Sequence, residues 1–248
     1  MIADTWHLFN KYMIITLRMP LWTLFTLIQP LIWLIIFGQL FGHFVQADNY
    51  IDFMVPGILI MTVLFGSSWS GVSLLREISA GTVDRLLVSP VSRVAIVLSR
   101  VMHSAVQVIA QALIILIVAW VMDSSLTMNI FYVLLAMLVV FLLGVGFAAI
   151  SNGFAITLQR EEPLVMIGNL MTLPLMFFSS ALVPKQFMPD WIQYISLINP
   201  ITYAVEAVRA VLIAPPDFMI YFKGLAVMLV FAGATLAWAV TAFNALRD

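Results

Sequence analysis

The chain has 248 residues, of which 63% are hydrophobic and 9% charged, and its formal net charge is −1. A soluble domain is typically about 45–50% apolar and about 25% charged, so these few charges cannot cover a water-facing surface, and we predict an integral membrane protein. The charge balance excludes the basic surface of a nucleic-acid-binding protein, and the absence of cysteine excludes disulfides, thiolate metal sites and a cysteine nucleophile.

The first 20 residues (1–20) are predicted to form an amphipathic helix that lies in the membrane interface. Within WHLFNKYMIITLRMP, which begins at Trp6, one helical face carries Trp6, Phe9, Met13 and Leu17. Lys11 and Arg18 lie on the opposite face, and Pro20 ends the pattern. A helix with one apolar and one basic face lies along a membrane surface. The alternative is that this stretch simply extends the first span.

Six segments are apolar over roughly the 20 residues that a helix needs to cross about 30 Å of hydrocarbon. Lipid offers the backbone no hydrogen bonds, so each segment is expected to be an α-helix and the fold to be all-α. The predicted spans are 22–41, 54–75, 102–122, 130–158, 163–183 and 220–243. We therefore predict one transmembrane domain over residues 1–248.

The distribution of Lys and Arg predicts the orientation of the spans, because cytoplasmic loops carry an excess of these residues. One set of loops and termini holds Lys11, Arg18, Arg76, Arg85, Arg93, Arg100, Arg160 and Arg247, and the opposite set holds Lys185, Arg209 and Lys223. The larger set places both termini in the cytoplasm. Arg100 lies in an apolar stretch, and we expect it at the cytoplasmic interface, where its side chain can reach water.

A charged segment, REISAGTVDRLLVSPVSR, begins at Arg76 between the second and third spans. Glycine inside a helix costs about 1 kcal/mol relative to alanine, so Gly81 predicts a break. We expect a short helix near Arg76–Ala80, a turn at Gly81-Thr82 and a second helix over 82–88. Thr82 is expected to cap this second helix, with Asp84 in its first turn, and Pro90 to end it.

This segment, 76–93, is predicted to contact a water-soluble partner on the cytoplasmic side. The residues that we assign to this contact are Arg76, Glu77, Gly81, Thr82, Asp84, Arg85, Leu86 and Pro90. The alternative is a positively charged loop that only fixes the orientation of the chain. That alternative explains the arginines but leaves the acidic residues and the Gly-Thr pair without a role.

Neutral polar side chains recur in the third, fourth and fifth spans. His103, Gln107 and Gln111 are spaced i, i+4 and i+8, so they form one stripe on a helix. Such side chains line a transport pathway or hydrogen-bond neighbouring helices, at about 0.6 kcal/mol each, and the sequence leaves both interpretations open. The candidates for the pathway are His103, Gln107, Gln111, Ser151, Asn152, Asn169, Thr172 and Ser179.

The outer stretch 184–217 is predicted to form two short helices that dip into the membrane. Pro189 suits a helix start, and Asn199-Pro200 ends one helix and begins another. Glu206 and Arg209 are spaced i, i+3 and are expected to pair with each other, with a substrate contact as the alternative. The residues assigned to this hairpin are Pro189, Trp191, Asn199, Pro200, Glu206 and Arg209.

The sequence lacks the common catalytic motifs. It has no G-x-x-x-x-G-K-[ST] phosphate loop and neither G-x-S-x-G nor H-E-x-x-H. We therefore predict a chain that is not an enzyme and that itself holds neither a metal nor a cofactor.

Two segments resemble the type-2 ABC transporter permeases. Glu77, Gly81-Thr82, Asp84, Leu86-Leu87 and Pro90-Val91 reproduce that family's pattern E-x-x-x-G-T-x-[DE]-x-L-L-x-x-P-[VI]. The segment FFSSALVPKQFMPDWIQYISLINPITYAVEAVR is similar to the proline-rich region before the family's last span. The drug exporter permeases of the daunorubicin-resistance type are the most similar group, and lipid-linked polysaccharide exporters share the architecture.

The resemblance implies the permease subunit of an exporter in the bacterial cytoplasmic (inner) membrane. Its substrate would be drug-like, a lipid or lipid-linked, moved out of the cytoplasm or the inner leaflet. A separate ABC ATPase subunit, in two copies, would bind ATP and Mg, and a second permease chain, expected to be identical, would complete the complex. The segment 76–93 would be its coupling helix and 184–217 a re-entrant hairpin. The alternative is a secondary transporter or a channel.

Overall fold

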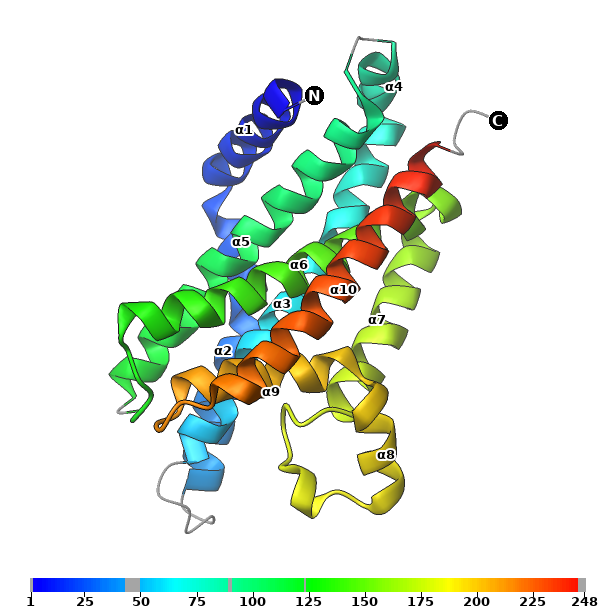
Figure 1. Ribbon diagram of the computed structural model, residues 1–248. Helices are drawn as coiled ribbons and strands as arrows, with labels where there is room; N and C mark the ends of the chain where they lie inside the picture. Colours follow the sequence, from blue (N-terminus) through cyan, green and yellow to red (C-terminus); the bar gives the residue numbers. More distant parts are fainter. Residues whose placement is uncertain (1, 43–49, 89–90, 123, 245–248) are drawn as a thin grey trace.

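The computed structural model describes residues 2–42, 50–88, 91–122 and 124–244, and all regular structure within these ranges is helical (Figure 1). The α-helices are α1 (Ile2–Arg18), α2 (Pro20–Gly42), α3 (Tyr50–Ser79), α4 (Thr82–Leu87), α5 (Arg93–Val121), α6 (Ile130–Leu158), α7 (Glu161–Phe177), α8 (Asp190–Ile198), α9 (Pro200–Leu212) and α10 (Phe218–Asn244). A 3-10 turn, η1 (Lys185–Phe187), precedes α8.

The long helices form a bundle with two distinct ends (Figure 1). The end that carries α4, here called the α4 end, also holds the start of α1 and the end of α10. The opposite end, the α8 end, holds η1, α8 and the connection from α9 to α10. A hydrogen bond of 3.0 Å from Arg93 Nη1 to the carbonyl of Asn244 joins α5 to α10 at the α4 end.

Four helices, α3, α5, α6 and α10, are long and apolar enough to cross a membrane. The pair α8 and α9 passes the same test together but is bent by 86° at its break. Part of α2 is a shorter apolar stretch, Phe25–Ile36. The fifth predicted span was expected to reach residue 183, but α7 ends at Phe177. Residues 178–182 form turns in place of the last part of the expected helix. The described residues therefore contain four span candidates, or five with the bent pair.

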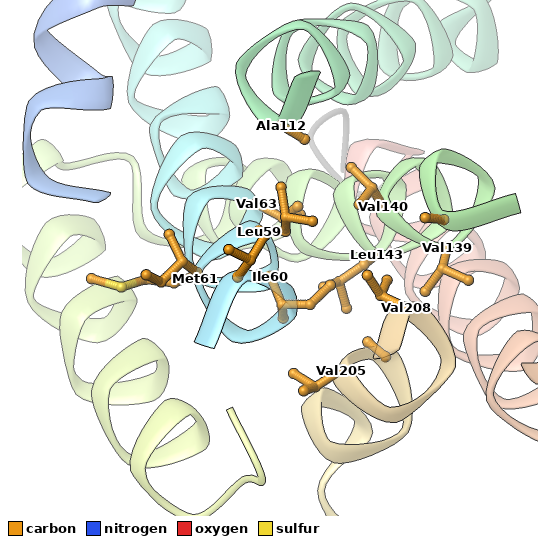
Figure 2. Close-up of a cluster of buried hydrophobic side chains, with 14 of the residues drawn as sticks. Leu59, Ile60, Met61, Val63, Ala112, Val139, Val140, Leu143, Val205 and Val208 are labelled. Atoms are coloured by element: carbon orange, nitrogen blue, oxygen red, sulfur yellow. The ribbon is translucent and has the colours of Figure 1, made fainter. Parts of the chain in front are cut away.

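Helix α3 lies at the centre of the bundle and is buried on several sides. Figure 2 shows Leu59 and Val63 of α3 in one apolar cluster with Ala112 of α5, Val140 of α6 and Val205 of α9. All five side chains are fully buried or nearly so. Burial of apolar area from four helices at once makes α3 the element on which the others pack.

Small residues bring α3 and α6 close together. A Cβ built at Gly71 would lie 2.2 Å from the carbonyl oxygen of Ser151, so only glycine fits there. This approach lets the Ser151 hydroxyl accept a hydrogen bond of 2.9 Å from the Gly71 N–H and donate one of 2.6 Å to the carbonyl of Ser68. Helix association in membranes depends on such small contact residues and on hydrogen bonds between helices.

Helix α1 is confirmed as a helix over most of the predicted range, and of its predicted apolar face Trp6 and Leu17 are exposed while Phe9 and Met13 are half-buried. Its inner face contacts the bundle through Leu8 and Tyr12, which are both buried. Trp6 is exposed and stacks on Phe9 at 5.5 Å between ring centroids. Part of the predicted apolar face therefore points away from the protein, as an interfacial helix requires.

The close contact of α3 with α6 predicts the effect of an added methyl group. Gly71→Ala should lower the thermal unfolding midpoint of the detergent-purified protein, because overpacking costs about 1–3 kcal/mol. Gly168→Ala is the matched control, since a Cβ there meets nothing within 4 Å, and it should keep or raise the midpoint because alanine favours helix. Equal midpoints for the two variants would contradict this packing.

Candidate functional site: the elbow at the α4 end and the cavities beside it

The sharp turn between α3 and α4 depends on one glycine. Gly81 has φ of +65°, in the left-handed region that glycine adopts without a steric cost. The turn is closed by hydrogen bonds from the N–H of Ala80 to the carbonyl of Arg76 (3.0 Å) and from the N–H of Gly81 to that of Ile78 (2.9 Å). The break and the second helix are confirmed, but the expected short helix at 76–80 is the last part of α3.

Helix α4 is anchored on one side and exposed on the other. Val83 is 2% exposed and belongs to the same apolar cluster as Ile96 of α5, against which Leu86 also packs. Arg85 and Val88 point outward, and Val88 is 88% exposed. The elbow formed by 80–88 is therefore held firmly to the bundle while its outer face remains free.

Two further residues predicted to contact a partner are Asp84 and Pro90. Pro90 lies outside the described residues. For Asp84 the structure describes the helical backbone in the first turn of α4 but not the side chain.

Glu77 points into the bundle, where it forms an ion pair with Arg100 of α5. Arg100 is 4% exposed and Glu77 19%. The hydroxyl of Tyr12 in α1 donates a hydrogen bond of 3.3 Å to the same carboxylate, and the Arg100 guanidinium lies 4.8 Å from the centre of the Tyr12 ring. Burial raises the pKa of Tyr12 to about 12, so the phenol remains a donor near neutral pH. The three residues join α1, α3 and α5 beside the elbow.

This arrangement corrects two expectations. Glu77 was expected to face a soluble partner and Arg100 to reach water at the interface, but each is the other's partner inside the protein. The physical reason is that a buried guanidinium needs a carboxylate close by. An arginine in an apolar stretch was the available signal, whereas nothing in the sequence pointed to Tyr12. The exposed Arg76 forms a surface ion pair with Glu161 at the start of α7, with Nε and Oε1 3.4 Å apart.

Two cavities open next to this cluster, on the side of α3 that faces α2. The first measures about 450 Å³ and lies between α1, α2, α3 and α5. The second measures about 560 Å³ and lies between α2, α3 and α7. Thr26, Trp69 and Val72 line both, so the two cavities are adjacent. Volumes of this size fall within the range of small-molecule sites, about 300–1,000 Å³.

Three of the predicted pathway residues line these cavities. His103 and Gln107 line the first, and Asn169 lines the second. His103 Nε2 also lies 2.8 Å from the hydroxyl oxygen of Thr16 in α1. The polar stripe of α5 therefore borders open space over its first half.

The other predicted pathway residues are engaged within the protein. Gln111 Nε2 donates to the hydroxyl of Thr26 at 2.8 Å, and Asn152 Nδ2 donates to that of Ser70 at 2.9 Å. The Ser179 hydroxyl donates to the carbonyl of Met176 at 2.7 Å. Ser151 and Thr172 line a cavity of only about 30 Å³. Some of the predicted polar residues therefore border cavities, as a pathway requires, and others form hydrogen bonds within the protein.

The region after α7 contains the two short helices that were predicted there, α8 and α9. The 3-10 turn η1 precedes them. Pro189 precedes α8, and Trp191 meets Phe178 edge to face at 5.9 Å between ring centroids. Pro200 is the first residue of α9, and the Asn199 side chain accepts a hydrogen bond of 3.0 Å from the N–H of Ile201. The helix break at Asn199-Pro200 is confirmed.

The expected pairing of Glu206 with Arg209 is wrong. Glu206 forms its ion pair with Lys185 of η1, with Nζ and Oε1 2.5 Å apart. Arg209 Nη2 instead donates to two backbone carbonyls, of Phe53 and Ser180, each at 3.1 Å. The Ser180 carbonyl lies beyond the end of α7, where carbonyls lack helical partners, and the Phe53 carbonyl lies in the first turn of α3. The spacing along α9 could not reveal either contact.

The family described as ABC-2 type transporter matches residues 3–213, which is most of this chain. The chain belongs to this family. It is 33% identical to the transport permease ycf38 of Cyanophora paradoxa over 220 residues. This alignment covers 84% of this chain and 73% of the relative. As a member of this family, the chain is a multi-pass membrane protein with a transport function. The family match confirms the resemblance that the sequence indicated.

Other ABC-2 relatives carry names that refer to drug resistance. The chain is 27% identical over 194 residues to the doxorubicin resistance ABC transporter permease protein DrrC of Mycobacterium tuberculosis, covering 77% of this chain and 70% of the relative. It is 24% identical over 209 residues to the daunorubicin resistance permease DrrB1 of Streptomyces coeruleorubidus, covering 84% and 74%.

The buried ion pair gives a prediction about stability. Glu77→Gln should destabilise this ABC-2 protein by about 3 kcal/mol, because it leaves the charge of Arg100 buried and unpaired. Arg76→Gln, which removes an exposed pair, should cost about 0–1 kcal/mol. Thermal unfolding in detergent compares the two variants. Adding Arg100→Met to Glu77→Gln should recover much of the loss, and no recovery would argue against the pair.

Proposed function

We propose that this chain is the permease subunit of an ATP-driven exporter and works with a separate ABC ATPase subunit. The observation that carries the proposal is the elbow at 80–88, which is anchored by Val83 and presents Arg85 and Val88 outward at one end of the bundle. A short, rigidly held and exposed helix at the end of a central span suits the transmission of force from a soluble partner. The chain's membership of the ABC-2 family supports an ABC ATPase as that partner.

The proposed topology puts the α4 end in the cytoplasm and both termini on that side. Most of the Lys and Arg side chains belong to segments at this end, which supports the orientation. In this arrangement α2, α3, α5, α6, α7 and α10 are the six spans, and α8 with α9 forms a re-entrant hairpin at the outer side. Such an arrangement suits a bacterial inner membrane, with the outward apolar face of α1 in the cytoplasmic interface.

The proposed assembly contains two permease chains and two ATPase subunits, and ATP and Mg bind to the ATPases. The two cavities beside α3 support a pathway for a drug-like, lipid or lipid-linked substrate, since they combine polar residues such as Gln107 and Asn169 with apolar ones such as Phe25 and Leu173. The names of the drug-resistance relatives favour the same class of substrate. The hairpin at α8 and α9 is proposed to close the outer end of this pathway.

The docking role of the elbow is tested by reversing its exposed charge. Arg85→Glu should reduce co-purification of the ATPase subunit with the permease by about fivefold or more, the lower range of a typical coupling energy. Arg18→Glu reverses an exposed charge on α1 instead and should leave co-purification unchanged. Both variants are expected to reach the membrane in normal amounts. Full retention of the ATPase by Arg85→Glu would refute docking through this face.

The pathway is tested by comparing two glutamines of one stripe. Gln107→Leu should change the drug resistance profile of cells that express the complex, because Gln107 borders a cavity. Gln111→Leu should lower the thermal stability instead, because it removes the hydrogen bond to Thr26. Resistance to doxorubicin and to daunorubicin is measured beside the amount of protein in the membrane. A Gln107→Leu variant that changes only the folded yield would favour a packing role.

A further inference from the structure

Between α7 and η1 the described chain leaves helical geometry at a place where its side chains are buried. We call residues 178–182 the neck segment. Ser179, Ser180 and Ala181 are all buried, so their carbonyl groups lack water. Irregular backbone at membrane depth persists only where protein groups satisfy it. The partners of these carbonyls therefore decide how the neck segment is held.

Asn199 provides the first set of contacts, from the corner between α8 and α9. Its Nδ2 donates to the carbonyls of Leu175 (2.6 Å) and Phe178 (3.0 Å) at the end of α7. Its Oδ1 caps α9 by accepting from the N–H of Ile201 at 3.0 Å. One buried side chain thus joins the two ends of the excursion 183–198, which contains η1 and α8.

Arg209 provides the second set, from one side of α9. Its Nη2 donates at 3.1 Å both to Ser180 in the neck segment and to Phe53 at the start of α3. Its guanidinium also lies 4.0 Å from the centre of the Phe53 ring. A Cβ built at Gly57 would lie 2.0 Å from the carbonyl oxygen of Ala181, so α3 touches the neck segment directly. Arg209 therefore binds α3, α9 and the neck segment together.

The elements that meet here differ in how firmly they are fixed. Helix α9 is buried along one face from Ile201 to Leu212, whereas α8 presents Trp191, Tyr194 and Ile198 outward. Three buried polar atoms at the junction have no protein hydrogen-bond partner: Ser180 Oγ, Thr202 Oγ1 and Arg209 Nε. Most buried polar atoms in proteins have a hydrogen-bond partner, so this junction is less completely hydrogen-bonded than the rest of a typical interior.

We propose that Arg209 and Asn199 are positioning residues that couple α3 to the excursion 183–198 during transport. Helix α3 is continuous from the Arg209 contact at Phe53 to Ser79, next to the elbow. A displacement of the elbow is therefore carried along α3 to the neck segment, and α8 follows because the neck joins it to α7. The inference rests on the proposed function, because the ATPase subunit would supply the force on the elbow. The contacts that hold the neck segment are independent of that function.

The first experiment measures the position of α8 without any partner subunit. The natural chain has no cysteine, so Tyr194→Cys in α8 and Ile130→Cys at the start of α6, both exposed, can carry the only spin labels. Labelled chains are diluted with unlabelled ones, so that the distance within one chain is read. Arg209→Gln and Asn199→Ser should each broaden or shift this distance. Serine keeps the helix cap but cannot reach Leu175 or Phe178.

Two further variants make the distance measurement specific. Arg209→Lys retains donors for the two carbonyls and should restore most of the original distribution. Lys223→Gln removes an exposed cation at the α8 end that lies over Tyr203, and it should change nothing. If Arg209→Gln fails to fold, Asn199→Ser decides the result. Unchanged distances in folded Asn199→Ser and Arg209→Gln would overturn the inference.

The second experiment measures ATP hydrolysis by the complex with the ATPase subunit. Arg209→Gln should change kcat by about fivefold or more and leave the KM for ATP unaltered, because the nucleotide site lies on the other subunit. Arg209→Lys should return kcat toward the original value. A changed distance with an unchanged kcat would overturn the coupling, since Arg209 would then support only the local fold. If the wild-type chain retains no ATPase, the proposed function fails, while the distances still test the neck.

Discussion

The constraint on which this structure depends is that polar groups inside an apolar bundle must find partners within the protein. Helix α3 meets this constraint at three levels. Arg209 binds the carbonyl at its start, Ser151 hydrogen-bonds the backbone at Gly71, and Glu77 pairs with a buried arginine near its end. These contacts fix α3 against α9, α6 and α5 in turn, so the central helix connects the two ends of the molecule through directed interactions as well as apolar packing.

The packing around α3 is uneven, because α6 contacts it closely whereas cavities separate it from parts of α2. On the side of α6, glycine at position 71 allows contact at backbone distance, and apolar side chains such as Val140 close the interior. On the side of α2, the cavities lined by Trp69 leave open space. On the first side, Asn152 and Ser151 form hydrogen bonds between helices, whereas Gln107 and Asn169 on the second side border the cavities. A transport pathway requires the second kind.

The candidate site was only partly predictable because the sequence gives positions along a helix but not the neighbours of that helix. The turn at Gly81 was predicted correctly, since a backbone preference is local. Gln107 and Gln111 share one stripe, yet the first borders a cavity and the second donates a hydrogen bond to Thr26 of α2, and their spacing along α5 does not distinguish the two. Glu77 was expected to face a partner, and the buried charge of Arg100 holds it inside the bundle instead.

The amino-acid sequence by itself determined that the protein is helical and lies in a membrane, because composition and span length depend only on the local transfer of residues into lipid. It also determined the family, through the motif around Gly81 and the proline-rich stretch before the last span. Tertiary structure alone decided which charges are paired, with Lys185 rather than Arg209 as the partner of Glu206, and which polar residues border cavities. Those outcomes depend on distances between helices that lie far apart in the chain, and no spacing along one helix encodes them.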